Sequence, residues 1–269
     1  MNSMFTAATI QFCCQLCSPE YNLQMMERLS RAAKLQDPSV ALLVFPELCT
    51  TGYECNEAFQ QLAEPVNGPS MARLGALCRE LECCMLYGFA ERANDGSIYN
   101  SAAFLSSSGK LTGVYRKVHL FGRETEWFCP GNALPILDTP LGKAGIMICW
   151  DVAFPEDARC LALNGADFLL LSSAWEHLYQ CNFTLAAQAR SYENCLPLVG
   201  SNRVGQEPEN LFIGHSAIYA PGGKLLTCLG EEEGIGIAPV YCRNSLEEAE
   251  YAFFANRRPD LYDPISRLK

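Results

Sequence analysis

The chain has 269 residues, of which 49% are hydrophobic and 19% charged, with a net charge of −10. This composition excludes a disordered or collagen-like chain and predicts one domain spanning residues 1–269, while the negative charge disfavours nucleic acid and anionic membranes as partners. We find no secretory signal and no apolar run near the ~18 residues of a transmembrane helix. We therefore expect a cytoplasmic protein whose 15 cysteines are mostly free thiols.

The first half of the chain alternates apolar strands with amphipathic helices. Period and composition predict strands at 6–12, 40–45 and 83–89, and helices at 22–35 and 70–81. Ser70 is a candidate N-cap of the second helix. A hairpin is predicted around Ser106-Ser107-Ser108-Gly109.

The second half repeats this alternation. Strands are predicted at 143–148, 168–172, 196–201 and 234–239, and helices at 155–164 and 181–193. Pro155 suits a first helical position. A second hairpin is predicted near Gly222-Gly223.

Two similar segments suggest that the halves share one plan. Residues 100–111 read NSAAFLSSSGKL, and residues 215–225 read HSAIYAPGGKL. Buried strands alternating with helices indicate covered sheets, and the hairpins make those sheets mixed rather than parallel. We expect two similar sheets packed face to face. The polar segment 240–269, which ends in aromatic and arginine residues, is predicted to pack on a second copy of the chain.

Cys149 is a candidate nucleophile. It ends the predicted strand at 143–148 and precedes a helix, so its thiol would be presented at a sheet edge near a helix N-terminus that favours a thiolate. A cysteine nucleophile needs a base, and His119 at a strand end is one choice. Glu47, which follows a buried strand between apolar neighbours, is the other, since a charge in such a place is costly unless paired or functional.

Lys117 ends another predicted strand. Its ammonium could balance Glu47 and Cys149 and then hold a developing oxyanion.

Several short motifs in order carry a family resemblance. They are Phe45-Pro46-Glu47, Gly52-Tyr53, YRKVHLF at 115–121, FCPG at 128–131, Ile148-Cys149-Trp150-Asp151, Phe154-Pro155-Glu156 and RRPDLY at 257–262. With these motifs the chain resembles the nitrilase superfamily of carbon–nitrogen hydrolases from its first strand to its tail.

The resemblance implies an α/β fold, a four-layer αββα sandwich with two mixed β-sheets. It also implies a catalytic triad at Glu47, Lys117 and Cys149 and a second glutamate in the following loop. By its place before FCPG we assign this glutamate to Glu124, with Glu126 as the rival.

The implied reaction is hydrolysis of a small amide or N-carbamoyl amine through a thioester on Cys149, without metal or organic cofactor. The tail and the resemblance together predict a homodimer or a higher homo-oligomer. Tyr53, Trp150 and Trp175 are candidates for the pocket wall, and Arg123, Arg203 or Arg73 could bind a substrate carboxylate.

Other readings of the sequence stay open. A nitrile could be the substrate, although Asp151 after the tryptophan favours the amidase and carbamoylase branches. The fold could also be an inactive oligomeric scaffold. A third alternative, a thiol redox protein, rests on the spacing of Cys14 and Cys17.

Overall fold

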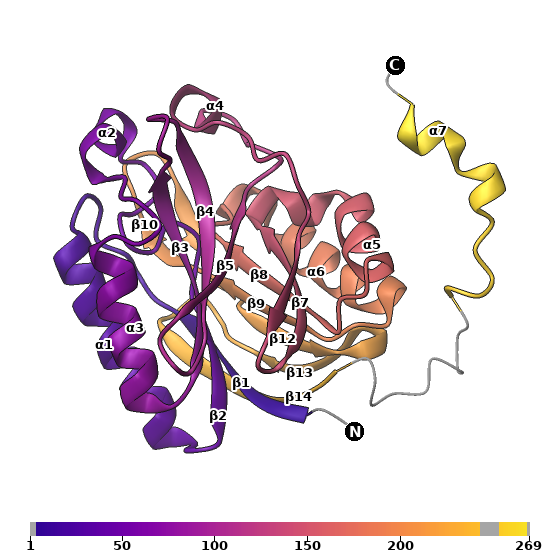
Figure 1. Cartoon of the computed structure of the whole chain (residues 1–269), viewed down its shortest axis with the longest axis horizontal. Coiled ribbons are helices and arrows are strands. Elements are labelled where there is room, and N and C mark those ends of the chain that lie inside the picture. Colours follow the sequence, from indigo (N-terminus) through magenta and orange to yellow (C-terminus); the bar gives the residue numbers. More distant parts are fainter. Residues whose placement is uncertain (1–3, 243–252, 268–269) are drawn as a thin grey trace.

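The computed structural model describes residues 4–242 and 253–267, and it is built on two six-stranded sheets (Figure 1). The first sheet has the order β14-β1-β2-β3-β4-β5 and the second β13-β12-β9-β8-β7-β6. The strands of the first sheet are β1 (Met4–Gln11), β2 (Val40–Val44), β3 (Cys84–Arg92), β4 (Ile98–Leu105), β5 (Leu111–Arg116) and β14 (Gly234–Tyr241). Those of the second are β6 (Ile136–Thr139), β7 (Gly142–Ile148), β8 (Phe168–Ser173), β9 (Leu198–Asn202), β12 (Ala217–Ala220) and β13 (Lys224–Cys228).

Both sheets are mixed, and each has a parallel centre with antiparallel hairpin strands at one edge. β1, β2 and β3 run parallel, as do β7, β8 and β9. The hairpins β4–β5 and β12–β13 extend the two sheets in the same way, which is the shared plan that the two similar segments predicted. The expectation of two mixed sheets in a layered α/β fold is confirmed.

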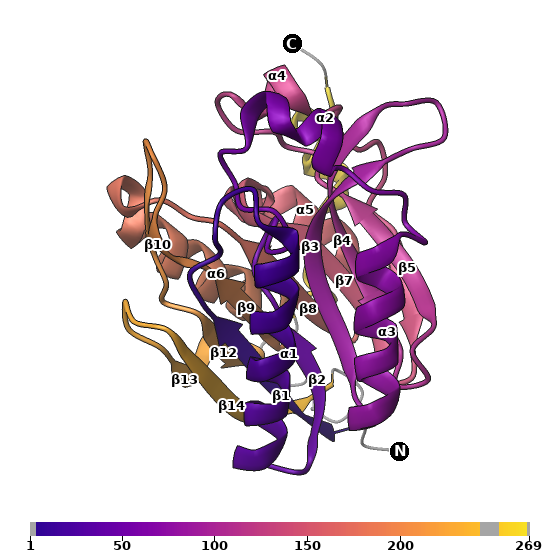
Figure 2. The same cartoon turned by 90° about the vertical axis from the view of Figure 1, so that its left-hand side faces the viewer.

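Helices cover the outer faces of the paired sheets (Figure 2). The helices of the described chain are α1 (Pro19–Gln36), α2 (Phe59–Leu62), α3 (Pro69–Leu81), α4 (Glu124–Trp127), α5 (Pro155–Leu163), α6 (Gln180–Asn194) and α7 (Asp263–Ser266). α1 and α3 lie on the first sheet, and α5 and α6 lie on the second. None of the helices among the described residues is both long and apolar enough for a membrane span.

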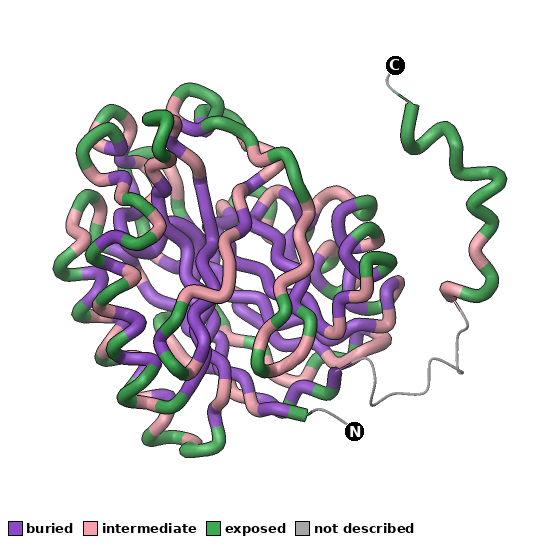
Figure 3. The backbone as a smooth tube through the Cα atoms, in the orientation of Figure 1, coloured by how far each residue is buried: buried purple, intermediate pink, exposed green. Residues whose placement is uncertain are grey.

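The core separates into an inner and an outer layer, and the alternation of side chains along β2 explains why. Leu42 and Val44 point into the cluster between the sheets, whereas Leu43 points to the cluster under α1 and α3. Phe5 and Phe168 meet across the sheets with ring centroids 5.1 Å apart. Buried residues follow the strands in Figure 3, so continuous apolar runs in the sequence correspond to strands covered on both faces.

The predicted N-cap of α3 is wrong. The helix begins at Pro69, and Gly68 occupies the N-cap position. Ser70 lies inside the first turn, where its backbone N–H donates to the Glu64 carboxylate at 2.9 Å. A carboxylate six residues earlier in the chain, outside the helix, therefore satisfies a free N–H at this end.

Strands β6, β10 (Val204–Gln206) and β11 (Leu211–Ile213) and the short helices α2 and α4 were not predicted. They are three or four residues long, too short for a periodic pattern.

The end of the chain leaves the sandwich. Phe253 packs on Tyr192 with ring centroids 5.6 Å apart, and Arg159 lies over the Phe254 ring. Beyond them the described residues of the tail are mostly exposed, and α7 lies away from the sheets in Figures 1 and 3. Part of the predicted interaction segment 240–269 falls outside the described residues.

Candidate active site

The three residues of the expected triad follow the carboxyl ends of three strands. Glu47 lies three residues after β2, Lys117 follows β5, and Cys149 follows β7. The backbone N–H of Glu47 donates to the carbonyl of Ser173, at the end of β8 in the opposite sheet, at 3.3 Å. The two sheets thus join their strand ends at this point.

A glycine on the neighbouring strand makes room for the Glu47 turn. A Cβ on Gly88 of β3 would lie 2.5 Å from the backbone nitrogen of Leu48 and 2.7 Å from the Cα of Glu47. Leu48 itself has a left-handed backbone with φ 46°. The turn after β2 therefore depends on a close backbone approach that only glycine at position 88 permits.

Lys117 lies between two carboxylates in the protein interior. Its Nζ is 2.8 Å from Oε1 of Glu47 and 2.7 Å from Oε1 of Glu124. All three side chains are almost completely buried. Burial by itself would lower the pKa of Lys117, but the charges of Glu124 and Glu47 outweigh it and keep that pKa well above its ordinary value. Lys117 is therefore a fixed cation.

Glu47 is held by donors from both sheets. The Asn100 side chain donates to Oε1 at 2.6 Å, and the backbone N–H of Ala174 donates to Oε2 at 2.8 Å. With Lys117, these donors compensate the buried charge and fix the direction of the carboxylate. Asn100 was not predicted as a site residue, although it opens one of the two similar segments.

Glu124 is held in a similar way at the first turn of α4. The Tyr53 hydroxyl donates to Oε1 at 2.7 Å, and the backbone N–H of Phe121 donates to Oε2 at 3.0 Å. Burial raises the pKa of Glu124, Lys117 opposes this, and Glu47 adds to it. Glu126 instead points outward, half exposed, and pairs with Arg123. Between the two candidates, the structure brings Glu124 to Lys117.

Cys149 has a strained backbone at the point where β7 ends. Its φ is 46°, in the left-handed region that non-glycine residues rarely adopt, and it opens a short 3₁₀ helix, η2 (Cys149–Ala153). Such strain clusters at functional sites.

The position of Cys149 near a helix N-terminus favours a thiolate, but its buried surroundings oppose one. Burial raises the pKa of the thiol well above its ordinary value, and Glu47 and Glu124 raise it further, against the opposing charge of Lys117. These surroundings favour the protonated thiol, whose attack on a substrate then needs a base.

The three predicted aromatic residues all border the narrow pocket at Cys149. Tyr53, Trp150 and Trp175 line it together with Phe121, Ala174, Glu176 and Tyr179. The Trp150 and Trp175 rings lie 5.6 Å apart. A wider outer cavity of about 240 Å³ shares Tyr53, Phe121 and Glu176 with this pocket and reaches the surface near Arg123 and Glu209. The Cys149 thiol thus lies at the narrow end of a funnel lined largely by aromatic residues.

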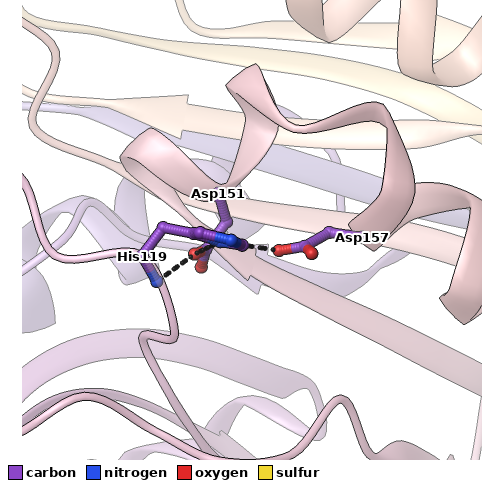
Figure 4. Close-up of side chains that lie close together, drawn as sticks. All are labelled: His119, Asp151 and Asp157. Carbon is purple, nitrogen blue, oxygen red and sulfur yellow. Dashed lines mark hydrogen bonds and ion pairs between the residues drawn. The ribbon is translucent and has the colours of Figure 1, made fainter. Parts of the chain in front are cut away.

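His119, the alternative base, is engaged elsewhere (Figure 4). Its Nδ1 lies 3.1 Å from Asp151 and 3.2 Å from Asp157, and its ring stacks on Phe154 at 3.8 Å. The Asp151 hydrogen bond raises the pKa of His119, and burial opposes it. His119 lies two residues after Lys117, and Asp151 lies two residues after Cys149. Their contact therefore holds the Lys117 and Cys149 segments together.

Within the described chain, His119, Asp151 and Asp157 form a cluster of the residue types that can bind a metal ion. Both oxygens of Asp151 already accept hydrogen bonds: Oδ1 from the backbone N–H of His119, and Oδ2 from the Tyr115 hydroxyl and the backbone N–H of Ile148. This saturation favours a structural ion pair over a cation site. That the reaction needs no metal and no organic cofactor stays a prediction.

Of the three arginines considered for a substrate carboxylate, only Arg123 lines a cavity. Arg203 is fully buried against Glu207, and Arg73 binds Glu27 and Glu20 on the outer surface between α1 and α3. Arg203 and Arg73 are therefore structural, which corrects their place among the candidates. The partners of Arg73 lie far away in the sequence, whereas Glu207 lies four residues after Arg203, a spacing that does not by itself show that the two side chains meet.

The Cys14–Cys17 pair lacks the properties of a redox motif. Burial raises the pKa of Cys14 to about 12, whereas Cys17 is exposed. Redox thiols of this spacing have lowered pKa values, so the geometry disfavours that reading.

Comparison with known proteins identifies the family. The model of the carbon-nitrogen hydrolase family matches residues 6–244. The chain belongs to this family. A probable nitrilase, C965.09, of Schizosaccharomyces pombe is 43% identical over 95% of this chain and 96% of its own length. An N-carbamoylputrescine amidase of Solanum lycopersicum is 32% identical over 99% and 96%.

A solved structure agrees with this assignment. The carbon-nitrogen hydrolase of Helicobacter pylori superposes with a TM-score of 0.93 at 27% identity, covering 99% of both chains. The resemblance to the nitrilase superfamily is confirmed, and the chain is a hydrolase of carbon–nitrogen bonds.

Proposed function

We propose that this carbon–nitrogen hydrolase cleaves a small amide or N-carbamoyl amine, with Cys149 as nucleophile and Glu47, Lys117 and Glu124 assisting. One observation carries the proposal: a buried lysine is clamped between two carboxylates, and their three charges act on a buried thiol that lines a pocket. The name of the tomato relative, N-carbamoylputrescine amidase, supports an amide-type substrate.

The first half of the reaction forms a thioester. Glu47 takes the proton of the Cys149 thiol, whose raised pKa makes a base necessary. The sulfur attacks the carbonyl carbon, and the Lys117 ammonium and the backbone N–H of Trp150 stabilise the oxyanion; one such donor is typically worth roughly 10²–10³ in rate. Glu47 returns the proton to the leaving nitrogen, so ammonia or an amine departs as the acyl group stays on sulfur.

The second half returns the enzyme to its resting state. Glu47, with help from Glu124, takes a proton from water as the water attacks the thioester carbon. The carbon–sulfur bond breaks, the acid leaves, and the proton returns to Cys149. The two carboxylates share Lys117, so they titrate as a coupled pair.

The test is release of ammonia from a panel of small amides and N-carbamoyl amines, with Cys149→Ala as the matched variant. We expect release by the unmodified chain and a fall of at least about 10⁴-fold in kcat for the variant. Mass spectrometry of the quenched reaction should show an acyl adduct on Cys149. Full activity of Cys149→Ala would refute the proposal.

A nitrile substrate is the second candidate, because the S. pombe relative is named a probable nitrilase. Nitriles belong in the same panel, and release from nitriles alone would favour this candidate. Silence across the panel, without an adduct on Cys149, would favour an inactive oligomeric scaffold.

We further propose a cytoplasmic homodimer or higher homo-oligomer in which the tail contacts a second copy. Leu261 and Ile265 support this, since they are 61% and 63% exposed. Light scattering of the full chain should give at least twice the mass of 29.7 kDa, and deletion of residues 253–269 should lower it. A monomeric full chain at micromolar concentration would contradict the proposal, and cell fractionation tests the compartment.

A further inference from the structure

One carboxylate borders both the narrow pocket at Cys149 and the outer cavity. Glu176 follows Trp175 at the exit from β8, and it lines both spaces together with Tyr53 and Phe121. Its backbone forms an isolated antiparallel bridge with Phe212 of β11. The side chain is half-buried, and the bridge to Phe212 fixes the backbone from which it projects.

Other acidic groups on the cavity wall already have partners. Glu54 accepts hydrogen bonds from the backbone N–H of Glu209 and from the Asn210 side chain. Glu209 lies 3.6 Å from Arg123, and Glu124 is paired with Lys117.

Glu176 differs from them in having no such partner. No hydrogen bond or ion pair joins its carboxylate to any residue within 4–242 or 253–267. Partial burial raises its pKa, the charges of Glu54 and Glu47 raise it further, and the charge of Lys117 opposes them. A cation placed beside Glu176 would reverse this effect, because it would pair a partly desolvated charge and lower the local negative potential.

We infer that Glu176 binds the protonated amino group of the substrate, so that the preferred substrate is an amide or N-carbamoyl amine with a cationic end. This inference rests on the proposed function, because the amide end must reach Cys149 while the cation lies at the funnel wall. The aromatic rings of Tyr53 and Phe121 suit the intervening methylene groups and a nearby cation. The expected substrate thus carries a positive charge, whereas an arginine at this place would select a negatively charged one.

The test compares three amides of similar size and different charge: 4-aminobutanamide, pentanamide and succinamate. We expect kcat/KM for 4-aminobutanamide to exceed that for pentanamide by roughly ten- to a hundredfold, the usual strength of a charge-assisted hydrogen bond. Glu176→Gln should lower this ratio by about tenfold or more. Glu176→Lys should move the preference to succinamate. The preference should weaken as ionic strength rises.

Glu57→Gln is the matched control, because it removes the same charge from an exposed position on η1 (Asn56–Ala58) that lines neither space. It should change the ratio less than about twofold. A ratio near one in the unmodified chain, or an equal loss for both amides in Glu176→Gln, would overturn the inference while leaving the hydrolase intact.

A binding measurement separates failure of the inference from failure of the proposed function. Calorimetry on Cys149→Ala should give tighter binding of 4-aminobutanamide than of pentanamide, and Glu176→Gln in that background should remove the difference. If no amide is hydrolysed but this difference is present, the cation site stands and the proposed function fails. If neither amide binds, the inference fails, and the proposed function is then decided by the ammonia-release panel.

Discussion

Two buried ion clusters lie close together in the described chain, and they border different cavities. Lys117 with Glu47 and Glu124 forms the first cluster, and Arg203 with Glu207 forms the second. Every one of these side chains is less than a tenth exposed. Burial and pairing alone therefore do not distinguish a reactive group from a structural one.

The two clusters differ in what completes their hydrogen bonds. The Glu207 carboxylate accepts the backbone N–H groups of Tyr53 and Glu54, and Arg203 donates to the carbonyl of Cys14. This pair holds loops together, and Glu207 lines a separate cavity with Cys13 and Cys14.

The charges of the first cluster act instead on the Cys149 thiol, and Glu124 lines the outer cavity next to the pocket at Cys149. Tyr53 connects the two, because its backbone is held by Glu207 and its hydroxyl reaches Glu124. The Arg203–Glu207 cluster thus positions Tyr53, which lines the pocket at Cys149.

The largest expected effect comes from removing the cation of each cluster. Lys117→Met should lower kcat roughly 10³-fold or more, since it removes both the charge balance of the base and the oxyanion donor. Arg203→Met should lower the free energy of unfolding by roughly 3–5 kcal/mol, because Glu207 stays buried without its partner. The rate of amide hydrolysis measures the fall in kcat, and urea unfolding measures the loss of stability, in both variants.

Activity per folded molecule decides the outcome for Arg203→Met. We expect it to fall less than about tenfold, because Arg203 touches no reacting group. A loss as large as that of Lys117→Met would show that the second cluster takes part in the reaction, and the distinction between the clusters would fail.

The next largest effect tests whether Glu124, rather than Glu126, assists the proposed reaction. Glu124→Gln should lower kcat by roughly 10²-fold, because a glutamine amide cannot help Glu47 to take a proton from the attacking water. Glu126→Gln, two residues away and half exposed, is the matched control and should leave kcat within about twofold. Equal effects of the two variants on ammonia release would contradict the assignment of Glu124.

The smallest effect concerns the third ion cluster, at His119. The Asp151 hydrogen bond raises the folded-state pKa of His119 above its ordinary value, so its stabilisation is present below pH 6.5 and is lost as pH rises through the folded pKa. His119→Gln should therefore destabilise the fold by about 1 kcal/mol near pH 5.5 and by less near pH 9. Urea unfolding at both values measures the difference. A pH-independent difference would mean that His119 contributes packing on Phe154 rather than charge.

Much of the fold could be predicted from local pattern. Continuous apolar runs such as 40–45 predicted strands covered on both faces, and these became the parallel centres of both sheets. The elements that were missed, such as β6 and β10, are too short to show a period. The N-cap of α3 was misplaced because Glu64, outside the helix, supplies the acceptor.

The candidate site was only partly predictable. Charged residues after buried strands signalled Glu47 and Lys117, and the same signal could have found Glu176 after β8. Asn100 carries no such signal, since an asparagine within a strand is ordinary until its neighbour is known. Arg203 was considered for the pocket because the sequence did not place Glu207 beside it.

The sequence by itself determined which residues carry charge, a nucleophile or a strand-forming pattern, because these properties belong to each side chain and its neighbours along the chain. Only the tertiary structure decided which charges meet, that Glu124 rather than Glu126 reaches Lys117, and that burial raises the pKa of the Cys149 thiol. The reason is physical: pairing distance and loss of solvent depend on segments far apart in the chain, and these two quantities set the energy of a buried charge.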